Sequence, residues 1–334
     1  MKVLLYFEGE SLLSRSGIGR AMKHQIAALN HANVEYTLDP KDDYDILHIN
    51  TVGFTSPLII SQARRNNKKI IYHAHSTEED FRDSFILSNK IAPLFKKHLT
   101  NLYSSADCII TPTPYSKKLL ENYDIELPIF AISNGVDSSK YQYDKDKAKA
   151  FYNYFYLNED DKIIISAGLQ IKRKGIIDFI KVAKELPDYT FIWFGHTPKF
   201  ATLNDVRQAL NDLPSNVVMP GYIKGPIFEG AYSCADAFFF PSYEETEGIV
   251  VLEALAAKQD VIVRDIGVYE DWLEDGVNCF KGKTNEQFID IINKVVNKQV
   301  RSLERSAYET AQRRSLEIVG QKLKRVYEFV LQET

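Results

Sequence analysis

The sequence predicts an α/β fold with two domains, each built on a mostly parallel sheet that has helices on both faces. Short apolar runs that indicate buried strands alternate with stretches of helical periodicity, and this alternation stops once and then begins again. A chain of 334 residues, of which 45% are hydrophobic, is long enough to form two cores. We therefore expect two doubly wound domains of similar size.

The first domain is expected to contain six strands, with helices between most of them. The strands are expected at residues 2–7, 34–38, 46–50, 69–73, 108–111 and 128–132. The helices are expected at residues 17–29, 57–65, 91–103 and 115–123. Residues 138–161 interrupt the alternation, because this charged, tyrosine-rich stretch has no strand-like run. We interpret it as a partly helical connector and place the domain boundary at residue 160.

The alternation restarts in the second domain, which is expected to end at residue 315. Its strands are expected at residues 163–167, 190–194, 217–219, 237–240 and 261–264. Its helices are expected at residues 175–185, 203–210, 227–234, 248–257 and 285–297. A closing helix over residues 316–334 is expected to cross back to the first domain. Two Rossmann-like domains in tandem should face each other across a ligand cleft at the carboxyl ends of their strands.

The composition excludes several classes of protein. A net charge of −4 and a pI of about 6.0 do not favour nucleic-acid binding. The three cysteines, Cys108, Cys234 and Cys279, have no ligand spacing and indicate buried thiols in a reducing compartment. The first apolar run is too short for a secretory signal, and no run reaches the roughly 18 residues of a membrane span. We expect a cytoplasmic protein that can still lie on a membrane surface.

The most informative stretch is PSYEETEGIVVLEALAA, residues 241–257. Glu253 is the only charge in an apolar helix and needs a partner, because an unpaired buried carboxylate is costly. The first N–H groups of this helix, at Gly248, Ile249 and Val250, form a ready anion site. Together with Glu245 in the preceding loop, the segment offers amides for phosphate and carboxylates for hydroxyls, as a nucleotide sugar requires. The alternative is a core helix in which Glu253 pairs with a nearby Lys or Arg.

A basic turn, QIKRKG, follows the first strand of the second domain. Lys172, Arg173 and Lys174 stand at the start of a helix, where three cations can neutralise a diphosphate. The position of this turn at the end of a strand places it at the same expected cleft as Gly248. A solvated basic turn without function is the alternative.

The segment SGIG, residues 16–19, opens the first helix. The small residues Gly17 and Gly19 let backbone N–H groups approach a phosphate. A dinucleotide fingerprint is rejected, because Met22 stands in place of the third glycine and a long loop separates the glycines from the strand. An ordinary loop explains the glycine pair equally well.

Two histidines, His73 and His75, stand at the end of a strand of the first domain. A histidine there can donate to a sugar hydroxyl or accept a proton. A structural role is the alternative for each. Since the sequence offers no third ligand nearby, we expect no metal.

An apolar stripe at helical spacing runs through residues 89–103 beside several cations. The stripe consists of Ile91, Leu94, Phe95, Leu99 and Leu102; Lys90, Lys96 and Lys97 flank it, and Arg64, Arg65, Lys68 and Lys69 lie nearby in sequence. Such a surface suits an anionic membrane. The alternative is a helix packed on the sheet.

Taken together, these motifs resemble the retaining GT-B glycosyltransferases of family four, which carry a Glu-x7-Glu motif. The most specific segment is CADAFFFPSYEETEGIVVLEALAA, in which Glu245 and Glu253 have the family's spacing. Supporting segments are SGIGR, the strand-end histidines, TPTPYSKKLL, ISNGVD and KRKG, so the resemblance covers nearly the whole chain. It implies a GT-B fold, with two Rossmann-like doubly wound domains facing each other across a cleft.

The resemblance also implies roles for the second-domain residues. Glu253 would bind the ribose hydroxyls, and Glu245 would hold hydroxyls of the donor sugar. The amides of residues 248–250 would approach the sugar and the diphosphate. Lys174, helped by Arg173, would stabilise the departing diphosphate.

In the first domain, the resemblance implies that Gly17 and Gly19 form a wall near the phosphates. His75 would lie beside the transferred sugar, with His73 as the weaker candidate. His75, Lys174 and Glu245 are thus the expected catalytic residues.

The implied chemistry needs no protein nucleophile, metal or other cofactor. The acceptor hydroxyl attacks the face that the diphosphate leaves, the leaving phosphate takes the proton, and catalysis is mainly electrostatic. The sequence departs from the family at Glu247, which replaces an aromatic residue, and at Lys258, which replaces a small one. Gly168 and Leu169 stand where many members have an arginine, which leaves Lys172 or Arg173 as its substitute.

Within the family, HAHSTEEDF and AGLQIKRKG are similar to bacterial transferases that build glycosyl-diacylglycerols, in particular those adding α-galactose to α-glucosyl-diacylglycerol. This similarity implies UDP-galactose, and next UDP-glucose, as donor and a membrane glycolipid as acceptor. It also implies peripheral association with the inner face of the cell membrane. The alternatives are a transferase of the same fold with a soluble or polysaccharide acceptor, and a noncatalytic module that binds nucleotide sugars.

Overall fold

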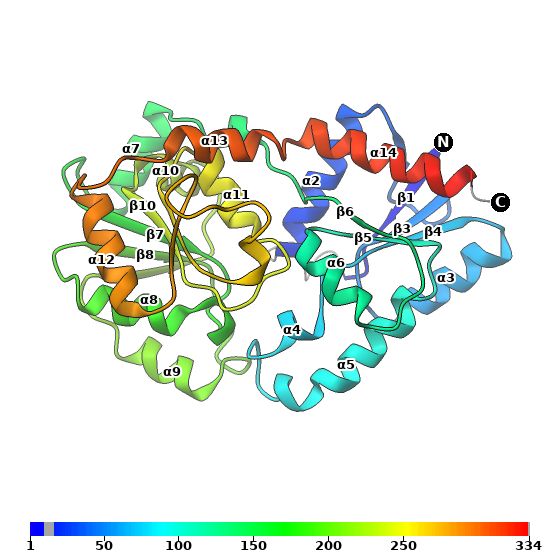
Figure 1. Cartoon of the computed structure of the whole chain (residues 1–334), viewed down its shortest axis with the longest axis horizontal. Helices are drawn as coiled ribbons and strands as arrows, with labels where there is room; N and C mark the ends of the chain where they lie inside the picture. The colour runs from blue at the N-terminus through cyan, green and yellow to red at the C-terminus, as the bar shows by residue number, and fades with distance from the viewer. Residues whose placement is uncertain (10–16, 333–334) are drawn as a thin grey trace. The chain divides into compact units, whose positions relative to one another are not determined.

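The computed structural model describes residues 1–9 and 17–332, which form two compact units (Figure 1). Unit 1 comprises Met1–Phe81, Asn89–Gly135 and Arg314–Thr334; unit 2 comprises Arg82–Ser88 and Val136–Arg313. The first part of the SGIG motif, Ser16, lies outside the described residues. Within the described ranges, no helix is both long and apolar enough to cross a bilayer.

Unit 1 contains a six-stranded sheet in the order β2-β1-β3-β4-β5-β6, with every pairing parallel. The strands are β1 (Lys2–Tyr6), β2 (Glu35–Thr37), β3 (Ile46–Ile49), β4 (Lys69–His73), β5 (Cys108–Thr111) and β6 (Ile129–Ala131). Alternate side chains enter two separate cores, so that Leu4 joins one while Val3 and Leu5 join the other. A parallel sheet covered on both faces explains why its strands are apolar throughout.

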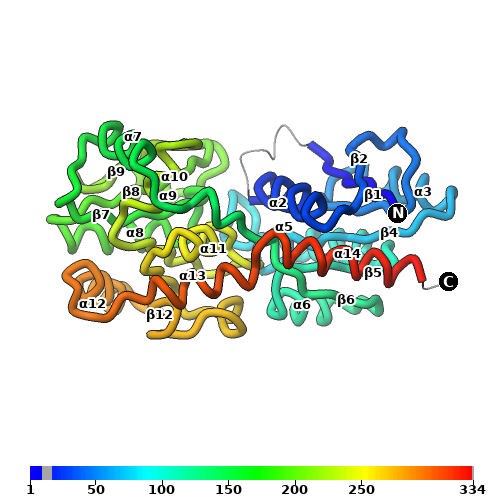
Figure 2. Tube along the Cα trace, turned by 90° about the horizontal axis from the view of Figure 1, so that it is seen from above, coloured from blue at the N-terminus to red at the C-terminus, as the bar shows by residue number. Residues whose placement is uncertain are grey.

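Helices cover both faces of this sheet. They are α2 (Gly17–His31), α3 (Ser56–Arg65), α4 (Glu78–Phe81), α5 (Ser88–Tyr103), α6 (Pro114–Glu121) and α14 (Leu316–Gln332). The C-terminal helix α14 runs beside α2 in both views (Figures 1 and 2). Gly320 permits this approach, because a Cβ there would lie 2.0 Å from the carbonyl oxygen of Ala28. The last helix of the chain therefore completes the core of unit 1.

Unit 2 contains a second six-stranded parallel sheet, in the order β12-β11-β10-β7-β8-β9. Its strands are β7 (Ile163–Ala167), β8 (Thr190–Phe194), β9 (Val217–Gly221), β10 (Ala237–Phe240), β11 (Val261–Arg264) and β12 (Phe280–Gly282). Strand β12 was not expected, because its three residues contain no apolar run. The two sheets confirm the expected fold class.

The helices of unit 2 include one from the expected connector. They are α7 (Lys145–Phe155), α8 (Ile176–Lys184), α9 (Asn204–Asn211), α10 (Pro226–Cys234), α11 (Ile249–Ala256), α12 (Asn285–Val296) and α13 (Glu304–Gln312). Helix α7 packs against α10 and buries Ala148 and Phe151. The helical part of the connector thus belongs to unit 2, whose main segment begins at Val136 and not at residue 161.

Candidate active site

Helix α11 begins with a glycine in the left-handed region. Gly248 is its N-cap residue, with φ +89°, a conformation that residues with a side chain rarely adopt. The hydroxyl oxygen of Tyr269 lies 3.1 Å from the point where a Cβ of Gly248 would stand. The N–H groups of Ile249 and Val250 precede the first intrahelical hydrogen bonds, so this end of α11 can bind an anion.

Glu245, in the loop before this helix, is buried and forms an ion pair with the partly buried Lys174. The Nζ of Lys174 donates to both carboxylate oxygens, at 2.5 and 2.6 Å, and the hydroxyl of Ser242 donates to Oε1 at 2.6 Å. Burial raises the pKa of Glu245, but the charges of Lys174 and Arg173 and the hydrogen bonds from Lys174 and Ser242 outweigh burial and hold this pKa below its ordinary value. The carboxylate is therefore ionised at neutral pH.

The turn that carries Lys174 packs directly on the loop that carries Glu245. Gly175 ends the short 3-10 helix Lys172–Lys174 with φ +75°. A Cβ at Gly175 would lie 2.2 Å from the carbonyl oxygen of Pro241. This contact brings the basic turn and the acidic loop together, although they lie far apart in the sequence.

The three cations of the basic turn have different partners. Arg173 is buried; its Nη1 donates to the carbonyl of Glu244 at 2.6 Å and its Nε to the hydroxyl of Ser84 at 3.0 Å. Lys172 forms a partly exposed ion pair with Asp205, at 2.8 Å. Lys174 and Arg173 thus lie beside Glu245, whereas Lys172 points to Asp205.

Glu253 is fully buried within α11. Its Oε2 accepts a hydrogen bond of 3.0 Å from the hydroxyl of Tyr232, on α10. Tyr232 was not expected at the site, because nothing in the sequence predicts which residue of a neighbouring helix faces this carboxylate.

Arg264, at the end of β11, binds the loop that carries Glu245. It was also not expected from the sequence. Its Nε donates to the carbonyl of Pro241 and its Nη2 to Asp178, both at 3.1 Å. The guanidinium lies 3.9 Å from the ring centre of Tyr243, whose hydroxyl donates to the same carboxylate of Asp178 at 2.7 Å. The only sign of this role in the sequence was a single cation at the end of an apolar strand. This network holds the loop in place.

In unit 1, His73 and His75 stack together with a third histidine, His48. The ring centres of His73 and His75 are 4.0 Å apart, and those of His48 and His73 are 5.3 Å apart. The Nδ1 of His48 lies 2.8 Å from the hydroxyl of Tyr327, on α14. His48 was not expected, but its position on β3, the strand beside β4, brings it next to the other two.

All three imidazoles are neutral at physiological pH. Burial lowers the pKa of His75 to about 4, and burial followed by the charge of His75 lowers that of His48 to about 3. The same causes hold the pKa of His73 well below its ordinary value. Neither ring nitrogen of His73 has a hydrogen-bond partner within the described ranges. None of these rings can act as a general acid near neutral pH.

The two glycines of the SGIG motif occupy the first turn of α2. Gly17 is exposed, and a Cβ there would meet nothing within 4 Å, whereas Gly19 is buried. Packing among the described residues therefore does not require a glycine at position 17. Its suggested place beside phosphates stays a prediction.

The apolar stripe expected at residues 89–103 divides into two parts. Leu99 and Leu102 are buried against the sheet, as the alternative interpretation holds. Ile91 and Leu94 are 43% and 69% exposed. Lys90 and Lys97 are exposed beside them, whereas Lys96 lies over the ring of Tyr123. The start of α5 thus presents exposed apolar and cationic side chains.

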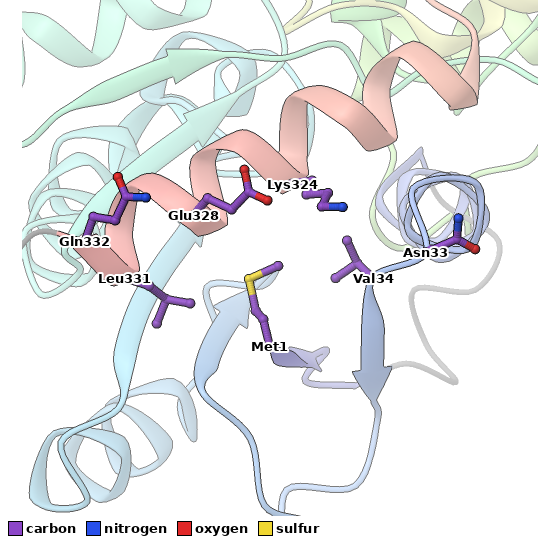
Figure 3. A pocket seen from close by; sticks show the side chains of 7 residues that line it. All are labelled: Met1, Asn33, Val34, Lys324, Glu328, Leu331 and Gln332. Carbon is purple, nitrogen blue, oxygen red and sulfur yellow. The ribbon is translucent and has the colours of Figure 1, made fainter.

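A hollow of about 400 Å³ in unit 1 is not part of this site (Figure 3). Residues Met1, Asn33, Val34, Lys324, Glu328, Leu331 and Gln332 line it. Met1 and Val34 precede the strands β1 and β2, so the hollow lies at the amino ends of these strands. Ligands of such sheets bind at the opposite, carboxyl ends.

Comparison with known proteins decides the family. Residues 153–314 match the model of glycosyl transferases group 1, and residues 15–140 match that of Glycosyltransferase Family 4. Over 332 residues, covering 99% of both chains, the protein is 46% identical to the processive diacylglycerol alpha-glucosyltransferase of Acholeplasma laidlawii. This chain is a glycosyltransferase of family 4. The expected recognition as a GT-B glycosyltransferase related to the glycosyl-diacylglycerol synthases is confirmed, as is the expected enzyme class, a hexosyltransferase. The roles expected of the Glu-x7-Glu motif and the retaining mechanism stay predictions.

Other relatives agree with this assignment. The glycosyltransferase is 26% identical to the alpha-galactosylglucosyldiacylglycerol synthase of Streptococcus pneumoniae, over 79% of this chain and 70% of that protein. HepE of Anabaena, solved with UDP-glucose, has a TM-score of 0.78 at 16% identity and covers 98% of this chain and 99% of its own. Sucrose-phosphate synthase from Thermosynechococcus elongatus has a TM-score of 0.81 at 16% identity, with both chains fully covered. These two structures show the GT-B fold of the enzyme.

Proposed function

We propose that this enzyme moves a hexose from a UDP-sugar to a membrane glycolipid with retention of configuration. The observation that carries the proposal is the largely buried Lys174–Glu245 ion pair beside the glycine that begins α11. The full-length relative at 46% identity, which is named as a diacylglycerol glucosyltransferase, supports a glycolipid product. The solved HepE complex with UDP-glucose supports a UDP-sugar donor.

Different residues of unit 2 bind different parts of the donor. Glu253 binds the ribose hydroxyls, and Glu245 binds hydroxyls of the sugar. The first amides of α11, at Ile249 and Val250, face the diphosphate. Lys174, aided by Arg173, supplies positive charge to the leaving phosphate, and Glu245 fixes the position of that charge in advance.

The transfer itself is balanced without a protein nucleophile or a metal. The acceptor hydroxyl oxygen bonds to the anomeric carbon while the bond from that carbon to the phosphate oxygen breaks. The hydroxyl proton passes to the departing phosphate, and both events occur on one face of the sugar. In unit 1, His75 stands beside the transferred sugar as a neutral ring.

The donor hexose is either glucose or galactose. The sequence motifs favour galactose, as the pneumococcal relative's name does. The relative at 46% identity is named for glucose, which favours UDP-glucose. Competition between the two labelled donors in one reaction decides between them.

The acceptor lies in a membrane, and the exposed face of unit 1 supports docking there. Phe54, which precedes α3, is 94% exposed, Leu58 in α3 is 71% exposed, and Leu94 on α5 is 69% exposed. The Nε2 of His98 on α5 lies 3.0 Å from the carbonyl of Val52, which places the two apolar segments close together. Apolar side chains beside Lys90 and Lys97 suit an anionic lipid surface. We therefore place the enzyme on the inner face of the cell membrane.

The test uses purified enzyme and anionic vesicles that contain α-glucosyl-diacylglycerol. We expect release of UDP only when acceptor lipid is present, with an α-linked product by NMR. Inactivity with both donors and all glycolipid acceptors would reject the proposal. Turnover with a soluble acceptor, without flotation on vesicles, would support the polysaccharide alternative. Loss of turnover in a folded Glu253→Ala variant would exclude a noncatalytic binding module.

A further inference from the structure

The ring of His75 is held in a fixed plane by the histidine stack. His75 and His73 are nearly parallel, at 11°, and His73 and His48 at 16°. Stacking fixes the plane of a ring but does not determine which of its nitrogens carries the proton. In a neutral imidazole one nitrogen donates and the other accepts, so the choice decides what His75 can offer a ligand.

Asn50 lies where it can determine which nitrogen of His75 carries the proton. It follows β3, is buried, and its backbone N–H donates to the carbonyl of Tyr6 at 3.1 Å. Its side-chain nitrogen donates to the carbonyl of His48 at 3.4 Å, and its Oδ1 lies 3.1 Å from Nε2 of His75. The carbonyl of His48 can only accept, so the amide must turn its nitrogen to that carbonyl and its oxygen to His75. An oxygen facing Nε2 requires a proton on Nε2.

We propose that Asn50 is a positioning residue that fixes His75 as its Nε2–H tautomer and so leaves the lone pair on Nδ1. This inference deepens the proposed function and rests on it where it concerns the substrate. A ring in this form can only accept at Nδ1, so a hydroxyl of the transferred sugar that meets this nitrogen must donate to it. The low pKa of His75 agrees, because a ring that stays neutral keeps one acceptor nitrogen.

The neighbouring histidine, His73, has no comparable hydrogen-bond partner within the described ranges. The two ring nitrogens of His73 have no hydrogen-bond partner within the described ranges, so no group selects its tautomer. His73 therefore contributes to the site by stacking, and His75 is the histidine prepared for a directional contact. Of the two histidines of the HAH motif, the structure thus favours His75.

NMR of the full-length enzyme with 15N-labelled histidine rings tests the tautomer directly. His75 is assigned by comparison with His75→Gln. At pH 7 we expect its Nε2 to carry the proton in the wild type and in Asn50→Asp, which keeps an acceptor oxygen. In Asn50→Leu we expect this preference to be lost. A wild-type His75 protonated at Nδ1, or an unchanged tautomer in Asn50→Leu, would overturn the inference.

Kinetics separate this inference from the proposed function. Loss of one well-oriented hydrogen bond should raise KM for the UDP-sugar about tenfold in Asn50→Leu, with partial rescue in Asn50→Asp. Asn211→Leu, an exposed asparagine at the end of α9, is the matched control and should match the wild type. If the tautomer changes as expected but turnover does not, Asn50 still sets the ring while the assignment of His75 to the sugar fails. The wild-type spectrum alone decides the tautomer if a variant does not fold.

Discussion

At the scale of single residues, Glu253 carries a specific prediction. Its carboxylate is fully buried in an apolar helix and accepts a hydrogen bond from Tyr232. If it also binds the ribose, Glu253→Ala should weaken UDP binding about tenfold or more, since a hydrogen bond left unmade costs roughly 1–3 kcal/mol. Titration calorimetry with UDP measures this change. Glu317→Ala, at an exposed glutamate of α14, is the control, and unchanged UDP affinity in Glu253→Ala would refute the ribose assignment.

Tyr269 offers a stability test beside the same site. Its hydroxyl is buried without a hydrogen-bond partner within the described part of the chain, which is costly for a polar group. Tyr269→Phe should therefore raise the free energy of unfolding by about 1 kcal/mol. Tyr103→Phe is the matched control, because the hydroxyl of Tyr103 donates to the carbonyl of Ser76 at 2.8 Å and its loss should destabilise. Urea unfolding of both variants measures the difference, and destabilisation by Tyr269→Phe would contradict the prediction.

Lys174, Glu245 and Glu253 could be predicted from the sequence, but the side chains that position them, such as Tyr232 and Arg264, could not. Lys174 and Glu245 could be found because their motifs follow strands, and the carboxyl ends of parallel strands lie at one edge of a sheet. Tyr232 and His48 could not be found in this way. Each stands alone within an apolar stretch, and its role depends on a neighbour that is far away in the sequence. A tyrosine in a core helix carries no signal until the opposite carboxylate is known.

At the scale of elements, the exposed start of α5 carries a prediction about membrane binding. Lys90 and Lys97 are exposed beside Leu94, and each lysine near an anionic surface contributes about 1 kcal/mol. The double variant Lys90→Glu, Lys97→Glu should lose most of its flotation with anionic vesicles. The control reverses two exposed charges on α8 of unit 2, Lys181→Glu and Lys184→Glu. Equal flotation of both variants would show that α5 is not the docking surface.

The elements themselves were predictable where apolar periodicity was strong. Residues 237–240 and 261–264 are buried on both faces and appear as strands at the expected positions. Strand β12 was not predicted, because this three-residue edge strand, FKG, has no apolar run of its own and is held by pairing with β11. The stripe of α5 was expected to face one surface, but its end is buried and its start exposed. Periodicity defines a face of a helix without showing how far the covering sheet extends.

At the scale of the whole molecule, long-range packing determined what the sequence could not. The expected connector contains α7, whose buried residues Ala148 and Phe151 have the spacing of any amphipathic helix. Its packing against α10, together with the contact of Phe155 with Phe194 of β8, assigns it to unit 2. By contrast, the presence of two separate sheets followed from the interrupted alternation of strands and helices, because each run of alternation builds its own sheet.

The buried histidines predict how the stability of the protein depends on pH. His48 and His75 have folded-state pKa values of about 3 and about 4, below the ordinary value of 6.5, and that of His73 is also lowered. Below pH 6.5 the unfolded chain takes up protons that the folded chain does not. Their full contribution to stability is therefore present above pH 6.5 and is lost progressively as the pH falls toward 4. Between pH 7 and 5.5 each histidine should lower the free energy of unfolding by about 1 kcal/mol.

Urea unfolding at several pH values between 5.5 and 7 measures this slope. His48→Gln should reduce the slope by about one third, whatever its effect on stability at pH 7, because one of three protonation steps is removed. His31→Gln, at an exposed histidine at the end of α2, is the control and should keep the wild-type slope. A wild-type slope near zero in this range would mean that the three rings take up protons in the folded state. The prediction that all three rings of the stack stay neutral would then be wrong as well.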